Sequence, residues 1–281
     1  MFKFIFLIKK NFLLILILIL ISCSADEKIL PGKRKAVIDY NLNNEINYDI
    51  YDEDPGFESL FQNKMSGHPG VNNGHSGGHL KLDFPLKKIW KTKISGSKED
   101  FVKLPQPVIA NNLVYVVGYN AIISAYNINN GDYVWGTIIE ENPDEIFPGL
   151  AGGLATNGQF IAVHASRKNL LLLDAKTGKL KWLIEHKEPL AGGPTFLGNK
   201  SVAVTDLDGK IFVYDLDNGS ILWQRVGIYE DTVYFGASSP AYNNNEVVLV
   251  GSSGDVSVHN GNDGDLIWAD NIVNSTPITP L

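Results

Sequence analysis

The chain has 281 residues, a hydrophobic content of 44% and a formal net charge of −7. This length suits one large or two small domains, and the apolar content is ordinary for a globular protein with a sizeable core. The negative charge argues against a nucleic-acid partner, because phosphate binding needs clustered Lys and Arg. A single cysteine excludes an intrachain disulfide and a multi-cysteine metal site.

The first 22 residues have the pattern of a secretory signal. Three lysines precede an apolar run at 12–21, which is about half of the roughly 20 residues that a spanning helix needs. The run leads to Ile-Ser-Cys, which resembles the bacterial lipoprotein box, in which Cys23 becomes the acylated first residue. With Ser24 next, the resemblance implies an outer-membrane lipid anchor facing the periplasm. A plain signal peptide at 1–22 or an uncleaved anchor is the alternative.

Residues 23–79 are predicted to form a lipidated, largely disordered tether and a loop that leads into the repeats. Acidic residues dominate 39–64, and such a stretch buries too little apolar surface to offset its ordering entropy. His68, His75 and His79 follow, and on a helix the last two would share one face, as in a zinc site. The intervening glycines disfavour a helix. We therefore expect a loop packed on the domain and no metal.

Tryptophan and glycine recur together along the rest of the chain. Tryptophans stand at 90, 135, 182, 223 and 268, and the last four each follow a glycine by four residues. These pairs are Gly131 and Trp135, Gly178 and Trp182, Gly219 and Trp223, and Gly264 and Trp268. A period of about 45 residues is the size of one propeller blade.

Each period contains the same expected elements. The segments 111–135, 158–182, 199–223 and 244–268 contain a Val- and Ile-rich strand, a hairpin turn, a second strand, a glycine turn and a strand that ends in tryptophan. A short strand near a proline in each connection makes four antiparallel strands per period. The sequence therefore predicts an all-β fold at 80–281, a β-propeller of four-stranded blades.

The fixed offset predicts what the repeated residues do. Glycine gives the turn its positive φ, and the constant spacing fixes the strand register, so that every indole emerges on the same side. We expect each indole, including that of Trp90, to dock its blade against a neighbour and bury about 150–250 Å². A β-sandwich with chance Gly–Trp pairs is the alternative.

These units resemble the repeats of pyrroloquinoline-quinone-type (PQQ) β-propellers. The segment LLDAKTGKLKW at 172–182 is similar to the family pattern A-x-D-x-x-T-G-x-x-x-W, with Leu172 in place of the alanine, and the other units match more loosely. Two branches share such repeats. Quinoprotein dehydrogenases bind the quinone and calcium, whereas the BamB family of outer-membrane assembly lipoproteins has a lipobox, a tether and no known cofactor.

The acidic residues of the repeats lie mostly in expected hairpin turns and not in a central cluster for calcium. Segments 30–37, 68–80 and 85–90 are similar to the N-terminal region of alphaproteobacterial BamB members. The resemblance therefore implies a non-catalytic scaffold without a cofactor. Its implied partners are the barrel-forming subunit of the assembly machinery and unfolded outer-membrane proteins, with membrane contact through the lipid anchor. A fragment of a PQQ-dependent dehydrogenase and a glycan-binding propeller are the competing hypotheses.

The family's partner-contacting loop corresponds to 228–235 here. Its basic residue is replaced by Phe235, which puts a conserved ion pair in doubt. Val233, Tyr234 and Phe235 would form an apolar anchor for the partner, or alternatively the innermost strand of a blade. Since the resemblance implies eight blades and about half are present, we expect an N-terminal fragment of a longer protein. A natural half-propeller that dimerises is the alternative.

Overall fold

The computed structural model describes residues 59–94, 104–118, 122–138, 153–164, 168–226, 238–251 and 254–271. All of them belong to one compact unit, Phe57–Leu281. The predicted signal peptide, Cys23 and the loop residues Val233, Tyr234 and Phe235 lie outside the described residues. Within the ranges that are described, no helix is both long and apolar enough to cross a membrane.

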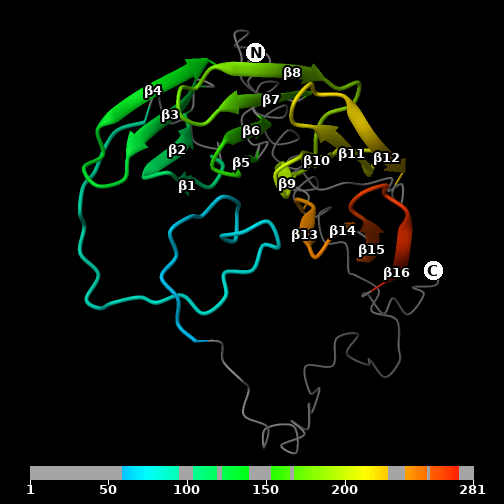
Figure 1. Ribbon diagram of the computed structural model, residues 1–281, viewed down its shortest axis with the longest axis horizontal. Coiled ribbons are helices and arrows are strands. Elements are labelled where there is room, and N and C mark those ends of the chain that lie inside the picture. Colours follow the sequence, from blue (N-terminus) through cyan, green and yellow to red (C-terminus); the bar gives the residue numbers. More distant parts are fainter. Residues whose placement is uncertain are drawn as a thin grey trace, which may run out of the picture. The chain divides into compact units, whose positions relative to one another are not determined.

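The described strands form antiparallel sheets of four strands each, and each sheet uses strands that follow one another in the chain (Figure 1). Blade 1 contains β1 (Val108–Ala110), β2 (Leu113–Val117), β3 (Ile122–Asn127) and β4 (Tyr133–Ile138). Blade 2 contains β5 (Leu154–Thr156), β6 (Phe160–His164), β7 (Asn169–Asp174) and β8 (Leu180–Glu185). Blade 3 contains β9 (Thr195–Leu197), β10 (Ser201–Thr205), β11 (Lys210–Asp215) and β12 (Ile221–Val226). Blade 4 contains β13 (Ala241–Asn243), β14 (Glu246–Val250), β15 (Asp255–Asn260) and β16 (Leu266–Asn271).

The predicted all-β fold of four-stranded antiparallel blades is confirmed. All four blades share one register between their third and fourth strands. The tryptophans at 135, 182, 223 and 268 pair with Ala125, Leu172, Val213 and Val258, and a one-residue shift follows each pair. The glycines at 131, 178, 219 and 264 have φ angles of 75°, 71°, 73° and 77°. These angles lie in the left-handed region, which glycine adopts without a steric cost. The repeated spacing therefore produces a repeated geometry.

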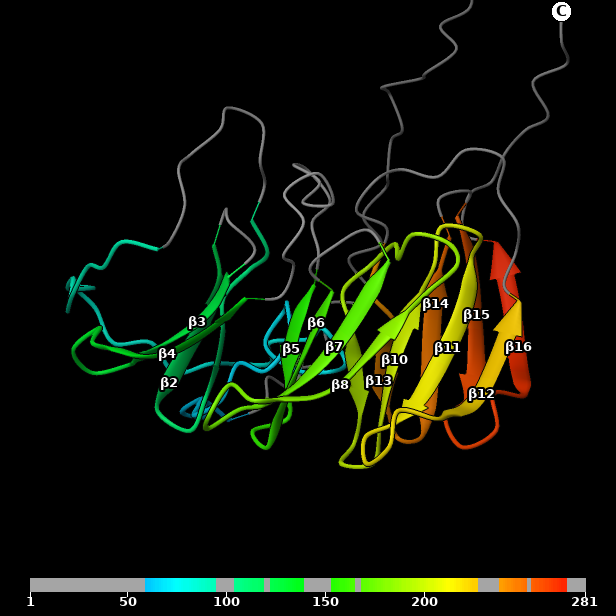
Figure 2. The same cartoon turned by 90° about the horizontal axis from the view of Figure 1, so that it is seen from above.

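The continuous apolar runs of the middle strands are explained by packing on both faces of each sheet. In β6, Ile161 and Val163 enter the core between blades 1 and 2, whereas Phe160 and Ala162 enter the core between blades 2 and 3. Successive sheets thus pack face to face (Figure 2). A strand buried on both faces cannot alternate apolar with polar residues, unlike a strand with one face in water.

The innermost strands β1, β5, β9 and β13 lie next to one another in chain order (Figure 1). Just before β5 and β9 the backbones of blades 2 and 3 come very close, because a Cβ built on Gly153 would lie 1.8 Å from the Cα of Gly193. Any larger side chain at Gly153 would therefore push the two backbones apart.

Residues 66–75, which we call the strap, run past the innermost strand of every described blade. The strap is held by backbone or histidine contacts to Ile109 of β1, Thr156 of β5, Phe196 of β9 and Tyr242 of β13. In Figure 1 it belongs to the blue and cyan segment beside these strands. The loop that precedes the repeats is thus packed on the blades over this stretch.

Candidate functional site

The junctions between blades bring together residues that the sequence analysis singled out. A Cβ built on the glycines at 131, 178, 219 and 264 would lie 2.7, 2.4, 3.3 and 2.4 Å from an indole carbon of Trp90, Trp135, Trp182 and Trp223, respectively. Each of these tryptophans therefore lies flat against the glycine turn that follows in the chain. For the last three, that turn belongs to the next blade. Glycine leaves the room that the indole occupies.

Most of these indoles also donate a hydrogen bond to the turn on which they pack. The Nε1–H groups of Trp90, Trp182 and Trp223 donate to the carbonyl oxygens of Ile128, Leu216 and Gly261, at 2.6, 3.1 and 3.0 Å. Each acceptor stands three residues before the glycine of the turn, so the geometry repeats from junction to junction. A buried indole N–H that is satisfied in this way fixes the orientation of the ring.

Trp135 is the exception among these tryptophans. Its buried Nε1 has no hydrogen-bond partner within the described part of the chain. The equivalent acceptor, the carbonyl of Ala175, instead accepts a hydrogen bond of 3.1 Å from the hydroxyl of Tyr115. The Tyr115 ring lies 5.9 Å from the Trp135 ring. The phenol therefore replaces the indole as the polar link from blade 1 to blade 2.

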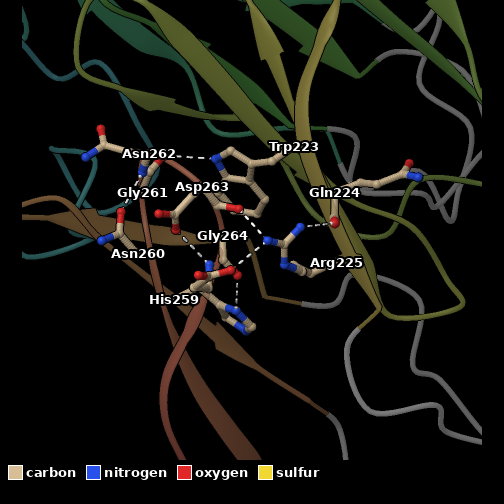
Figure 3. A network of polar contacts seen from close by, with 10 residues as sticks. Trp223, Gln224, Arg225, His259, Asn260, Gly261, Asn262, Asp263 and Gly264 are labelled. Atoms are coloured by element: carbon tan, nitrogen blue, oxygen red, sulfur yellow. Dashed lines mark hydrogen bonds and ion pairs between the residues drawn. The ribbon is translucent and has the colours of Figure 1, made fainter.

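Polar contacts at the rim differ from one junction to the next. Between blades 3 and 4, Arg225 donates to the carbonyl of Asp263 at 2.7 Å (Figure 3). It also pairs with the Asp265 carboxylate at 2.8 Å. Between blades 2 and 3, Lys181 pairs with Asp217 at 3.2 Å. Both carboxylates are largely exposed, so these pairs contribute little stability. The indoles and glycines are the constant part of each junction.

Trp268 has different surroundings from the other repeat tryptophans. It is 49% exposed, whereas Trp135 and Trp223 are 9% and 5% exposed. The structure therefore brings four tryptophans against the predicted glycines and leaves the fifth half in solvent.

The outer strands β4, β8, β12 and β16 form a candidate interaction surface, which we call the outer edges. Each is the last strand of its sheet, so one side of its backbone is unpaired within the sheet. Each also exposes large apolar side chains, namely Tyr133, Val134, Ile138, Leu180, Leu183, Ile221, Leu222, Val226, Leu266 and Ile267. An edge strand with exposed apolar side chains can accept an added strand from another chain.

A cleft of about 630 Å³ lies between the outer halves of blades 2 and 3. Phe212 and Tyr214 of β11 stack in it with an interplanar angle of 10°, and the buried His186 meets Phe212 edge-on. The Tyr214 hydroxyl lies 3.2 Å from Nε2 of His186. Sequence reasoning missed this cleft, because its residues come from separate strands and form no motif.

Burial shifts the pKa values of three groups in the cleft, namely His186, Tyr214 and Asp206. Burial lowers the pKa of His186 to about 4 and raises the pKa of Tyr214 to about 12, with a further rise from the nearby Asp206. Burial also raises the pKa of Asp206. His186 and Tyr214 are therefore neutral over the physiological range, and their contact is a hydrogen bond between uncharged groups.

The histidines of the loop before the repeats take separate positions. His68 is buried against Phe196, His75 lies beside the strap's own backbone and blade 4, and His79 is exposed. Among the described residues, no three His, Cys, Asp or Glu side chains gather as metal ligands would.

In the repeat turns, Asp174 accepts hydrogen bonds from the backbone N–H and the hydroxyl of Thr177 at 2.8 and 2.7 Å. The hydrogen bond from the hydroxyl is the main reason that the pKa of Asp174 is lowered.

Comparison with known families gives one match that covers more than half of the chain. The family model described as outer membrane protein assembly factor BamB matches residues 120–279. The match includes the turn glycines and the tryptophans of all the described blades. The family predicted from the repeat pattern is therefore confirmed.

Individual relatives are distant. BamB of Yersinia pestis is 22% identical over 206 residues, which cover 72% of this chain and 52% of that protein. The quinoprotein alcohol dehydrogenase PedH of Pseudomonas putida is 26% identical over 153 residues, which cover 50% of this chain and 25% of the enzyme. The crystal structure of BamB from Moraxella catarrhalis superposes with a TM-score of 0.50 at 19% identity, over 64% of this chain and 52% of that one. This chain thus spans about half the length of the BamB relatives it matches.

Proposed function

Because this chain belongs to the outer membrane protein assembly factor BamB family, we propose that it is a non-catalytic scaffold of the machinery that inserts β-barrel proteins into the outer membrane. The observation that carries the proposal is the family match over residues 120–279. The repeats alone do not carry it, because one fold hosts many functions. The proposed partners are the barrel-forming subunit and unfolded outer-membrane proteins.

The outer edges support this role by their chemistry. The strands of outer-membrane barrel proteins alternate apolar and polar residues, and their backbone groups become paired with neighbouring strands only in the closed barrel. An outer edge offers unpaired backbone groups together with apolar side chains such as Leu183 and Leu222. Strand addition satisfies the backbone groups of both chains, whatever the client sequence. We assign client contact to the outer edges and partner contact to the loop that carries Val233, Tyr234 and Phe235.

The proposed location is the periplasmic face of the outer membrane, with a lipid anchor on Cys23. Each acyl CH₂ contributes about 0.8 kcal/mol of membrane affinity, so multiple chains hold a protein almost permanently. In cells grown with labelled palmitate, the full chain is expected to carry the label and to sediment with outer membranes. The variant Cys23→Ser should lose both. Label on the Ser variant would contradict this assignment.

The direct test of the scaffold role is co-purification. The tagged full chain, extracted with detergent from outer membranes, is expected to bring down the barrel-forming subunit. An unrelated outer-membrane lipoprotein with the same tag serves as the control. Recovery of the barrel-forming subunit with both proteins, or with neither, would count against the proposal.

A quinoprotein dehydrogenase is the second candidate, favoured by the similarity to PedH over 153 residues. It predicts that the purified protein binds PQQ in the presence of calcium, with a change in quinone absorbance or fluorescence. A flat titration with and without calcium removes this candidate. Saturable binding would instead favour it over the scaffold.

A further inference from the structure

The strap connects blades that are not adjacent to one another. Ser66 and Ile109 exchange backbone hydrogen bonds of 2.9 and 2.8 Å, and the Thr156 N–H donates to the Gly67 carbonyl at 2.7 Å. Further along, the Tyr242 N–H donates to the Asn73 carbonyl at 2.8 Å. A segment of ten residues thus touches the innermost strand of blades 1, 2 and 4, and two histidines complete its attachment.

His68 attaches the strap to blade 3 as a hydrogen-bond acceptor. Its Nε2 accepts the backbone N–H of Phe196 at 3.1 Å, and its ring packs edge-on against the Phe196 ring. A nitrogen that accepts carries no proton, so the ring is neutral with its proton on Nδ1. Burial, together with the charge of His75, lowers the pKa of His68 to about 4. This agrees with the neutral form that the geometry requires.

His75 has the opposite arrangement. Its Nδ1 lies 2.6 Å from the carbonyl oxygen of Pro69, and its Nε2 lies 2.9 Å from the carbonyl oxygen of Pro240. Carbonyl oxygens only accept hydrogen bonds, so a neutral ring would satisfy one of them and turn a lone pair toward the other. Only the imidazolium, with a proton on each nitrogen, donates to both.

We propose that the strap is an acid-sensitive clasp across the innermost strands, in which His68 holds blade 3 as a neutral acceptor and His75 holds blade 4 as a donor to two carbonyl groups, and that the bond of His68 fails when its ring gains a second proton. The groups that face the pair from the blades are Phe196 and the Pro240 carbonyl, which do not ionise. The ionisable group that acts on His68 is His75, with the two ring centroids 6.4 Å apart. The inference does not depend on the proposed scaffold role.

His68 gives the clasp a stability that falls in acid. The pKa of His68 is lowered on folding, so its contribution is complete above the ordinary value of 6.5 and declines as the pH falls toward 4. Innermost strands line the central channel of a propeller. Release of the clasp in acid would therefore uncover the innermost strands on the side that the strap covers.

Ring nitrogen shifts of the full chain, measured by NMR, test the proposal on the native sequence. With both rings labelled with ¹⁵N at pH 6, His75 is expected to show two protonated nitrogens and His68 one protonated Nδ1 and one bare Nε2. A bare nitrogen on His75 while the Tyr242 amide remains protected from exchange would overturn the proposal. So would a protonated Nε2 on His68.

Amide exchange of Tyr242, corrected for its intrinsic pH dependence, gives the functional readout. The protection of the native protein is expected to fall as the pH drops from 6.5 toward 4, where His68 gains a second proton. His75→Gln should exchange roughly tenfold faster, because a charge-assisted hydrogen bond is lost. His79→Gln removes an exposed histidine next to the strap and should keep the native profile. A native profile in His75→Gln would refute the clasp.

Discussion

In blades 2 and 3 the inner and outer strands belong to the same sheet but have opposite surroundings. The inner strands β5 and β9 are buried along their whole length, and the strap lies against them. The outer edges leave most of their residues exposed, and β16 leaves all of them exposed. The stability of the inner side therefore depends on close packing, whereas the outer side is exposed and available to bind other chains. Substitutions on the two sides should separate stability from binding.

The largest effect is expected on the inner side, from Gly153→Ala. The new Cβ would lie 1.8 Å from the Cα of Gly193, and neither backbone can yield without moving a blade. We expect a loss of more than about 4 kcal/mol in the free energy of unfolding, seen in urea denaturation or as failure to fold. Gly198→Ala is the control, because no atom lies within 4 Å of a Cβ there and only its φ of +65° is strained. An equal loss in both variants would contradict the close fit.

The junctions between successive blades, where each tryptophan of an outer strand docks, are tested by Gly178→Ala and Gly219→Ala. Both glycines have similar positive φ angles, +71° and +73°, but a Cβ would approach the indole to 2.4 Å at Gly178 and to 3.3 Å at Gly219. We expect losses of about 3 kcal/mol and about 1 kcal/mol, respectively. Thermal and urea unfolding measure the difference. A greater loss at Gly219 would show that the indole contact does not set the cost.

Acid should weaken the contact between the outer halves of blades 2 and 3 through His186. Its pKa is lowered on folding, so its stabilising contribution is complete above pH 6.5 and is lost as the pH falls toward 4. We expect this group to contribute about 2 kcal/mol to the fall in unfolding free energy over that range. His186→Gln, which does not ionise, should reduce the acid sensitivity in urea titrations at several pH values. An unchanged pH profile would show that another group is responsible.

The smallest effect on stability is expected at the outer edges. A variant with Val134→Lys, Leu183→Lys, Leu222→Lys and Ile267→Lys changes one exposed apolar residue in each outer strand. Each change should alter the unfolding free energy by less than about 0.5 kcal/mol, while binding of unfolded outer-membrane protein, measured by pull-down, should fall severalfold. Gln224→Lys adds the same charge to β12 without removing an apolar side chain. Equal binding by the native and four-lysine proteins would exclude the outer edges as the contact surface.

The sequence was sufficient to predict the sheets because their determinants are local. Four residues separate each glycine from its tryptophan, and this spacing sets both the turn and the register. The same pattern led to the family. The direction in which Trp135 and Trp223 dock, onto the glycine turn of the following blade, follows from how the sheets stack and cannot be read from one repeat.

The contacts that sequence reasoning missed join residues far apart in the chain. His68 and Phe196 are separated by 128 residues, and His75 and Pro240 by 165. A cluster of histidines and glycines indicates a metal site or a loop, and only the packed fold shows that the imidazoles of His68 and His75 face backbone groups. The cleft at His186 and Tyr214 was missed for the same reason, since aromatic residues inside a strand normally indicate core.

The strap also changes how the blades depend on one another. In a stack where each unit touches only its neighbours, stability is a sum of local terms and unfolding can begin at one end. A segment that is hydrogen-bonded to Ile109, Thr156, Phe196 and Tyr242 couples the stability of blades that do not touch one another. Loss of one blade then loosens the hold on the others, so the array is expected to melt as a single cooperative unit while its clasp is closed, and blade by blade once it opens.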